Sequence, residues 1–235
     1  MKIGILKAGH VPRRVADRHP DYDVMFERLL AGRGLTFQSF DVEHGAFPAS
    51  VTEADGWLIT GSACGAYEDH AWIPPLEDFI REARAKSVRM IGICFGHQVL
   101  AQAMGARVEK FAGGRSMGAV NYECCGTGEA LTVLAFHGDQ VMTVPQGAAL
   151  TVSGSFCRIA GLAYEDDVGA PWAISLQPHP EFDVAYEADL IEAYSDGLPA
   201  EAVDAAKASL GAPLSNEIVA DRMAAFFKSG SADGA

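Results

Sequence analysis

Short apolar runs alternate with helical patterns over the first hundred residues. Residues 22–30 and a segment opened by Pro74 and Pro75 repeat apolar positions at helical spacing, and a third helical pattern follows residue 94. Apolar runs typical of buried strands separate them, at residues 2–7, 35–42, 56–60 and 88–93. Because crossover helices join parallel strands, this alternation predicts a three-layer α/β fold, a mostly parallel sheet with helices on both faces.

The pattern changes after residue 106. Short extended runs separated by glycine-rich turns predict extra, partly antiparallel strands at 117–123, 131–136, 149–153 and 159–164. After the apolar run 172–176, helical patterns occupy 184–194, 200–210 and 214–228, the last with Ser215 available as an N-cap and an apolar stripe that should close the sheet. No repeat or linker divides the chain, so we expect one domain over residues 1–235, frayed from about 229.

Composition narrows the class of protein. Apolar residues make up 49% of the chain and charged residues 21%, as in globular proteins, and no apolar run approaches the ~18 residues that span a bilayer. The N-terminal run lacks the features of a signal peptide, so we expect a soluble cytoplasmic protein. The net charge of -13 argues against binding to nucleic acid or anionic membranes.

Acidic residues are concentrated between Glu181 and Asp204, a stretch with eight carboxylates and no Lys or Arg. A solvated helical face is the favoured interpretation, and a docking surface for a basic partner is the alternative. The five cysteines are odd in number and form no Cys-x-x-Cys pair, which predicts free thiols in a reducing compartment and no metal site. No cofactor is predicted.

One cysteine stands in a distinctive setting. Gly92-Ile93-Cys94-Phe95-Gly96 follows an apolar strand and precedes a helical pattern, which is the layout of a sharp strand-to-helix turn that exposes a nucleophile. The alternative is a buried cysteine acting as a small hydrophobe. A free thiol has a pKa near ~8.5, so a nucleophilic Cys94 needs a base in addition to the helix dipole.

His179 is the best candidate among the seven histidines for that base. It follows the apolar run 172–176, and Pro178 and Pro180 enforce extended backbone around it. Since residues i and i+2 of an extended chain point the same way, Glu181 can lie beside the imidazole and orient it. A surface His-Pro loop with an unrelated glutamate is the alternative.

Together these motifs resemble those of the class I glutamine amidotransferases, over nearly the whole chain and in the same order. The elbow at Cys94 is followed 85 residues later by His179 in Pro178-His179-Pro180-Glu181. Gly61-Ser62-Ala63 stands where the family has an oxyanion loop, often Gly-Gly-Pro, and His137-Gly138-Asp139 resembles a segment of GMP synthase amidotransferase domains. The resemblance implies a flavodoxin-like fold.

The resemblance also implies roles for individual residues. Cys94 would attack the side-chain amide carbon of glutamine, His179 would act as base and then acid, and Glu181 would orient His179. Backbone N–H groups of Gly61, Ser62 and Phe95 would donate hydrogen bonds to the oxyanion. The substrate would be contacted by Gln98, His137 and Asp139. For His137 and Asp139 a purely structural role is the alternative.

These roles predict a cysteine hydrolase that releases ammonia and glutamate from glutamine through a γ-glutamyl thioester. No Gly-x-x-x-x-Gly-Lys loop occurs, and little chain follows Glu181, so the ammonia would pass to a partner synthetase subunit. Alternatively, the chain is a stand-alone γ-glutamyl peptidase. An inactive glutamine-binding or regulatory subunit is a third hypothesis. A related thiol hydrolase or chaperone group is the fourth, although its histidine directly follows the cysteine, where this chain has Phe95.

Overall fold

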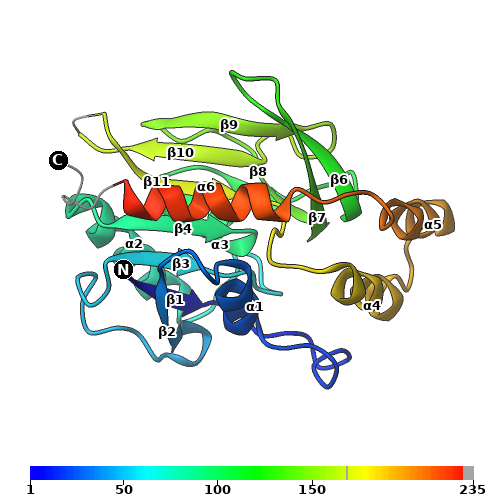
Figure 1. Ribbon diagram of the computed structural model, residues 1–235, viewed down its shortest axis with the longest axis horizontal. Coiled ribbons are helices and arrows are strands. Elements are labelled where there is room, and N and C mark those ends of the chain that lie inside the picture. Colours follow the sequence, from blue (N-terminus) through cyan, green and yellow to red (C-terminus); the bar gives the residue numbers. More distant parts are fainter. Residues whose placement is uncertain (168, 230–235) are drawn as a thin grey trace.

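The computed structural model describes residues 1–167 and 169–229. Within these ranges, nine strands form one sheet in the order β2-β1-β3-β4-β11-β10-β9-β6-β7 (Figure 1). Their bounds are β1 Lys2–Lys7, β2 Thr36–Asp41, β3 Gly56–Ile59, β4 Arg89–Ile93, β6 Ser116–Cys124, β7 Ala130–His137, β9 Ala148–Gly154, β10 Gly161–Glu165 and β11 Pro171–Leu176.

The first five strands in this order are parallel, as the alternating pattern predicts. Their side chains alternate between two apolar layers. Trp57 and Ile59 of β3 face the layer that contains α2 (Ile73–Ala85) and α3 (Phe95–Ala103). Leu58 points the other way, toward α1 (Tyr22–Leu29) and α6 (Asn216–Lys228). The three-layer α/β fold expected from the sequence is therefore confirmed.

The other four strands extend the sheet in antiparallel fashion. This half corresponds to the short extended runs after residue 106. A separate antiparallel ribbon pairs β5 (Val108–Lys110) with β8 (Asp139–Val141), and sequence reasoning missed it. Strands of three residues carry too few positions to show an alternating pattern.

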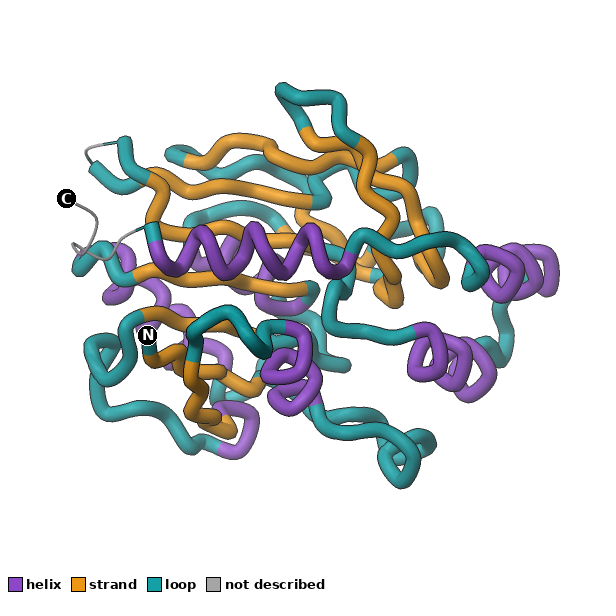
Figure 2. Tube along the Cα trace, viewed as in Figure 1, coloured by secondary structure: helices purple, strands orange, loops and turns teal. Residues whose placement is uncertain are grey.

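Three helices follow β11, namely α4 (Val184–Tyr194), α5 (Ala200–Ser209) and α6. Figures 1 and 2 show α6 lying along the sheet, with α4 and α5 beyond one end of it. The buried side chains of α6 pack in the same cluster as Ile91 and Ile93, so this helix covers the sheet as predicted. Among the described residues, no helix is both long and apolar enough to cross a membrane.

Two sequence expectations for this region need correction. Ser215 stands before α6 but its side chain caps nothing, because its Oγ accepts a hydrogen bond from the Thr132 N–H of β7 instead (3.1 Å). The acidic stretch is not one solvated face, since Glu181 and Glu187 are buried and Asp189 pairs with Arg18. The sequence predicts fraying from residue 229 onward. Of these residues only Ser229 is described, and its N–H donates to the Ala225 carbonyl of α6.

Candidate active site

A sharp backbone turn joins β4 to α3 at Cys94. Cys94 has a φ of 55° and a ψ of -103°, a conformation that residues with a side chain rarely adopt. Two glycines make the turn possible, because a Cβ at Gly92 would overlap the Gly96 carbonyl and a Cβ at Gly96 would overlap the Ile59 carbonyl. Strain of this kind costs about 1–3 kcal/mol and is concentrated at functional sites. The predicted glycine-flanked turn is therefore present, at the carboxyl edge of the sheet.

His179 and Glu181 lie between β11 and α4. Nδ1 of His179 is 2.7 Å from Oε1 of Glu181, and both side chains are almost fully buried. The carboxylate can only accept, so Nδ1 carries a proton and donates it. The His179 N–H donates to the Leu134 carbonyl (2.8 Å), and the imidazole stacks on the Phe182 ring with centroids 3.9 Å apart. These contacts leave Nε2 for the hydrogen bond between His179 and the Cys94 sulfur.

The environment of His179 favours its charged form. Burial opposes protonation, but the adjacent Cys94 sulfur and the Glu181 carboxylate outweigh it and hold the pKa of His179 well above its ordinary value. Gly61 is also adjacent, since a Cβ built on it would lie 3.1 Å from Cε1 of His179 and 3.9 Å from the Cβ of Cys94. Segments following three different strands thus meet at one point.

The predicted oxyanion donors lie on two neighbouring loops. Phe95 is the first residue of α3, so its N–H has no acceptor within the helix. Gly61 and Ser62 follow β3, the strand that pairs with β4. Their loop is held by Thr60 Oγ1, which donates to the Gly61 carbonyl (3.0 Å), and by Ser62 Oγ, which accepts from the Cys64 N–H (3.1 Å). Serine at position 62 therefore braces the loop that the family resemblance assigns to oxyanion binding.

A cavity of about 350 Å³ opens over this edge of the sheet, within the size range of small-molecule sites. Cys94 and His179 line it. Four other predicted site residues also line it, namely Ser62, Gln98, His137 and Asp139. Residues from distant parts of the sequence are therefore brought around one space.

Gln98 lies one helical turn after Cys94. Its amide nitrogen donates to the Asp139 carbonyl and to Oε1 of Gln177, both at 3.1 Å. Because an amide group has two N–H donors, both are used within the protein. A ligand in the cavity would meet Gln98 through its side-chain oxygen.

His137 and Asp139 also line the cavity. Nδ1 of His137 donates to the Asp139 carbonyl (3.1 Å), and burial lowers the pKa of His137 to about 4, with His179 adding repulsion. His137 is consequently neutral near pH 7, and its Nε2 has no partner in the described part of the chain. Partial burial raises the pKa of the Asp139 carboxyl, which accepts from the Tyr67 hydroxyl (3.3 Å).

Sequence reasoning missed several further polar side chains in the lining, among them those of Tyr67, Glu68, Lys110 and Arg115. The glycine-rich segment from Gly61 to Gly65 could have pointed to the first two, because loops after strand ends line such sites. Lys110 and Arg115 had no comparable signal. Lys110 ends β5, whose position depends on its pairing with β8.

Two groups of side chains in the described ranges bring possible metal-ligand atoms within 4.8 Å of one another. One consists of Cys64, Glu68 and His70, beside the cavity, where Nε2 of His70 is 2.9 Å from Oε2 of Glu68. The other consists of His10, Glu43 and His44. Neither group includes Cys94 or His179.

Comparison with known proteins relates the sequence to one family. The model of the family "Glutamine amidotransferase class-I" matches residues 20–191. Gamma-glutamyl peptidase 4 of Arabidopsis thaliana is 28% identical over 191 residues, covering 73% of this chain and 72% of the relative. One of the subunits of the glutamine-hydrolysing GMP synthase of Halobacterium salinarum is 26% identical over 177 residues, covering 71% and 87%.

Solved structures share the fold. A glutamine amidotransferase from Thermotoga maritima superimposes with a TM-score of 0.71 at 22% identity, covering 97% of this chain and 95% of the other. A glutamine amidotransferase from Methylobacillus flagellatus gives a TM-score of 0.67 at 24% identity, with coverage of 97% and 91%. At these identities the likeness concerns the fold alone.

Proposed function

Because this chain belongs to the class I glutamine amidotransferase family, we propose that it is a cysteine hydrolase that cleaves γ-glutamyl amide bonds through a γ-glutamyl thioester. The observation that carries this proposal is the position of Cys94, held at a strained turn beside the buried His179–Glu181 pair. The activities named in its relatives, γ-glutamyl peptidase and glutamine-hydrolysing GMP synthase, support the same bond as the target.

In the proposed reaction the Cys94 sulfur attacks the γ-carbonyl carbon. The oxygen then takes the negative charge and accepts hydrogen bonds from the backbone N–H groups of Phe95 and the Gly61-Ser62 loop, each worth roughly 3 kcal/mol in comparable sites. The C–N bond breaks as His179 gives its proton to the departing nitrogen. Water, deprotonated by His179, next attacks the thioester carbon and the C–S bond breaks, which releases glutamate and leaves His179 protonated again.

Glutamine is the simplest substrate, with ammonia as the leaving group. A second candidate, a γ-glutamyl peptide, is favoured by two cations in the cavity lining. Lys110 and Arg115 form no ion pair among the described residues, although their charges act on the Asp139 carboxyl, and they line the same cavity as Cys94. A peptide leaving group carries a carboxylate that such cations would attract, whereas ammonia carries none.

The test is glutamate release from glutamine and from a panel of γ-glutamyl dipeptides by the purified protein. Cys94→Ala should reduce activity on every substrate by about 10³-fold or more, because the nucleophile is lost. Cys125→Ala removes an exposed thiol and should leave activity unchanged. Turnover by Cys94→Ala at the wild-type rate would refute the mechanism.

The substrate panel also separates the remaining alternatives. A partner synthetase that accepts ammonia should raise glutamine hydrolysis when cell extract is added, whereas a stand-alone peptidase should work equally well without extract. An inactive binding subunit would bind glutamine without releasing glutamate under either condition, and Cys94 would not react with a glutamine-like chloroketone.

A further inference from the structure

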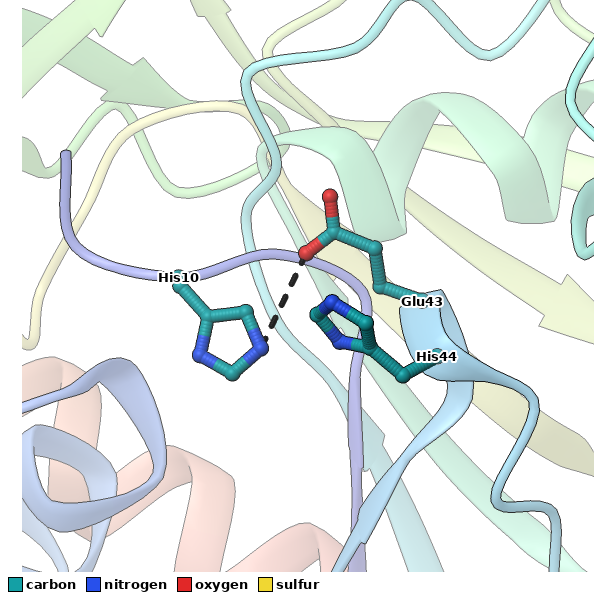
Figure 3. A group of neighbouring side chains, drawn as sticks. All are labelled: His10, Glu43 and His44. Carbon is teal, nitrogen blue, oxygen red and sulfur yellow. Dashed lines mark ion pairs between the residues drawn. The ribbon is translucent and has the colours of Figure 1, made fainter. Parts of the chain in front are cut away.

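Two loops at the carboxyl edge of the sheet bring a pair of histidines together. His10 follows β1, and Glu43 and His44 belong to η1 (Val42–His44), the short 3-10 helix that follows β2. Since β1 and β2 are parallel neighbours, the segments leaving them meet at the same edge. Figure 3 shows the rings of His10 and His44 and the carboxylate of Glu43 facing one another.

Three carboxylates surround the His10 ring. Nδ1 lies 2.7 Å from Oδ2 of Asp21, while Nε2 lies 3.2 Å from Oδ2 of Asp41 and 3.8 Å from Oε2 of Glu43. A neutral imidazole carries one N–H and one lone pair. Whichever nitrogen holds the proton, the other directs its lone pair at a carboxylate oxygen, which is repulsive. A metal ion at the second nitrogen would remove this repulsion.

The imidazole of His44 also pairs with a carboxylate through its Nδ1. Its Nδ1 lies 3.0 Å from Oδ1 of Asp41, and its ring centroid is 5.2 Å from that of His10. If each Nδ1 donates to its carboxylate, the Nε2 atoms of both rings are available to one ion. A carboxylate on the distal N–H is the usual partner of a metal-ligating histidine, because it fixes the tautomer and the ring orientation.

The surroundings carry excess negative charge. Four carboxylates, those of Asp21, Asp23, Asp41 and Glu43, lie in this region, and Lys7 pairs with two of them, its Nζ being 3.0 Å from Oδ2 of Asp21 and 3.8 Å from Oδ2 of Asp23. A divalent cation would balance most of this charge.

We propose that His10, Glu43 and His44 bind a divalent transition-metal ion of the zinc type through the two Nε2 atoms and the Glu43 carboxylate. Imidazole and carboxylate ligands suit such ions. One possible ligand atom from each of the three side chains already lies within 4.8 Å of the others. Atoms at about 2.1 Å from one ion lie up to about 4.2 Å apart, so the side chains need move by less than about 1 Å. Water or Asp41 completes the coordination. This proposal differs from the expectation of no metal site that the sequence gives.

The position of the ion indicates a structural role. Gly9, the residue before His10, packs so closely on the loop after β3 that a Cβ there would lie 2.7 Å from the Cα of Ser62. An ion that ties His10 to η1 would hold this loop in place. Binding to the folded chain alone should also raise its thermal stability.

The test is titration of the metal-free full-length protein with Zn²⁺ by calorimetry and with Co²⁺ by visible absorption. We expect one ion per chain and cobalt bands without thiolate charge transfer. His10→Ala and His44→Ala should each weaken binding by at least about tenfold and abolish the zinc-dependent rise in melting temperature. His70→Ala, in the group that contains Cys64, is the matched control and should bind as wild type does.

A subtler pair of variants tests the orienting carboxylate. Asp21→Asn should weaken zinc binding about tenfold, since Asp21 accepts from Nδ1 of His10, whereas Asp23→Asn should not. Circular dichroism establishes that each variant is folded. The proposal is overturned if Zn²⁺ and Co²⁺ do not bind, if binding survives unchanged in both histidine variants, or if it is lost in His70→Ala.

Discussion

The Glu181 carboxylate forms a hydrogen bond with a single side chain among the described residues, that of His179. Its Oε1 accepts from His179, and no donor in the described ranges reaches its buried Oε2. In contrast to a carboxylate shared among several donors, its charge acts almost entirely on the imidazole. This charge is one cause of the raised pKa of His179.

Replacing Glu181 by Gln should therefore lower kcat by about 10²–10⁴-fold with little change in KM, because the amide keeps the shape but does not stabilise the imidazolium. The pKa of His179 should fall, and the pH profile of kcat should shift with it. Steady-state kinetics across pH on the best substrate of the panel measure both effects. Glu123→Gln, at an exposed site, serves as the control, and an unaltered profile in Glu181→Gln would contradict this role.

Glu187 is a second buried carboxyl, outside the proposed reaction. Its Oε1 accepts from the Gly118 N–H (2.7 Å) and its Oε2 has no partner among the described residues. Burial raises its pKa from about 4.5 to about 7. Between these values the folded chain keeps a proton that the unfolded chain has lost, so the free energy of unfolding falls as pH rises from about 4.5 to about 7.

Glu187→Gln should remove this slope. Relative to the variant, the wild type should lose up to about 3 kcal/mol of unfolding free energy between pH 4.5 and pH 7, and the difference should stay constant above. Urea unfolding at several pH values gives both curves. Glu201→Gln, exposed on α5, should leave the slope unchanged, and equal slopes in wild type and Glu187→Gln would disprove a raised pKa.

At the scale of elements, the β4–α3 turn depends on how closely two backbones approach. Gly96 lies on the first turn of α3, against the carbonyl of Ile59 at the end of β3. Helix α3 can approach the sheet this closely only because Gly96 has no side chain. This same contact positions the N-terminus of α3 at Cys94.

Gly96→Ala should consequently destabilise the protein by about 3 kcal/mol or more, since the added methyl meets backbone that cannot rotate away. Gly211→Ala is the matched control, because a Cβ there meets nothing within 4 Å, and its effect should stay within about 0.5 kcal/mol. Thermal unfolding of both variants measures the difference. Equal stability of the two would show that the contact is not tight.

For the whole molecule, the proposed site depends on both halves of the sheet. Cys94 leaves the parallel half after β4, whereas His179 is anchored by its N–H to Leu134 of β7, the last strand of the antiparallel half. The halves are joined where β11 pairs with β4 on one side and with β10 on the other. Loss of either half would separate the sulfur from the imidazole.

This continuity predicts one cooperative unfolding transition, as for the single domain expected from the sequence. All three tryptophans, Trp57, Trp72 and Trp172, lie in the core layer that contains α2 and α3. Their fluorescence reports on that layer, while far-ultraviolet circular dichroism reports on the whole chain. Coincident urea midpoints from the two signals are expected, and two separate midpoints would indicate independent domains.

Local sequence determined much of this architecture. Apolar periodicity located β1, β2, β3, β4 and α1 to within one or two residues, because the side of an element that is buried repeats with the period of its backbone. The spacing of glycines around Cys94 and of prolines around His179 indicated the turn and the extended segment. Each is a property of neighbouring residues.

Tertiary structure decided what depends on residues far apart in the chain. Sheet order and the short β5–β8 pairing set which loops meet, and thus brought Lys110 to the cavity and His10 to His44. The side chains of Ser215 and Glu187 accept hydrogen bonds from β7 and β6, and the local sequence around each residue does not indicate these partners. Burial, and hydrogen-bond partners that lie far apart in the sequence, arise only when separate segments pack, so no local pattern contains them.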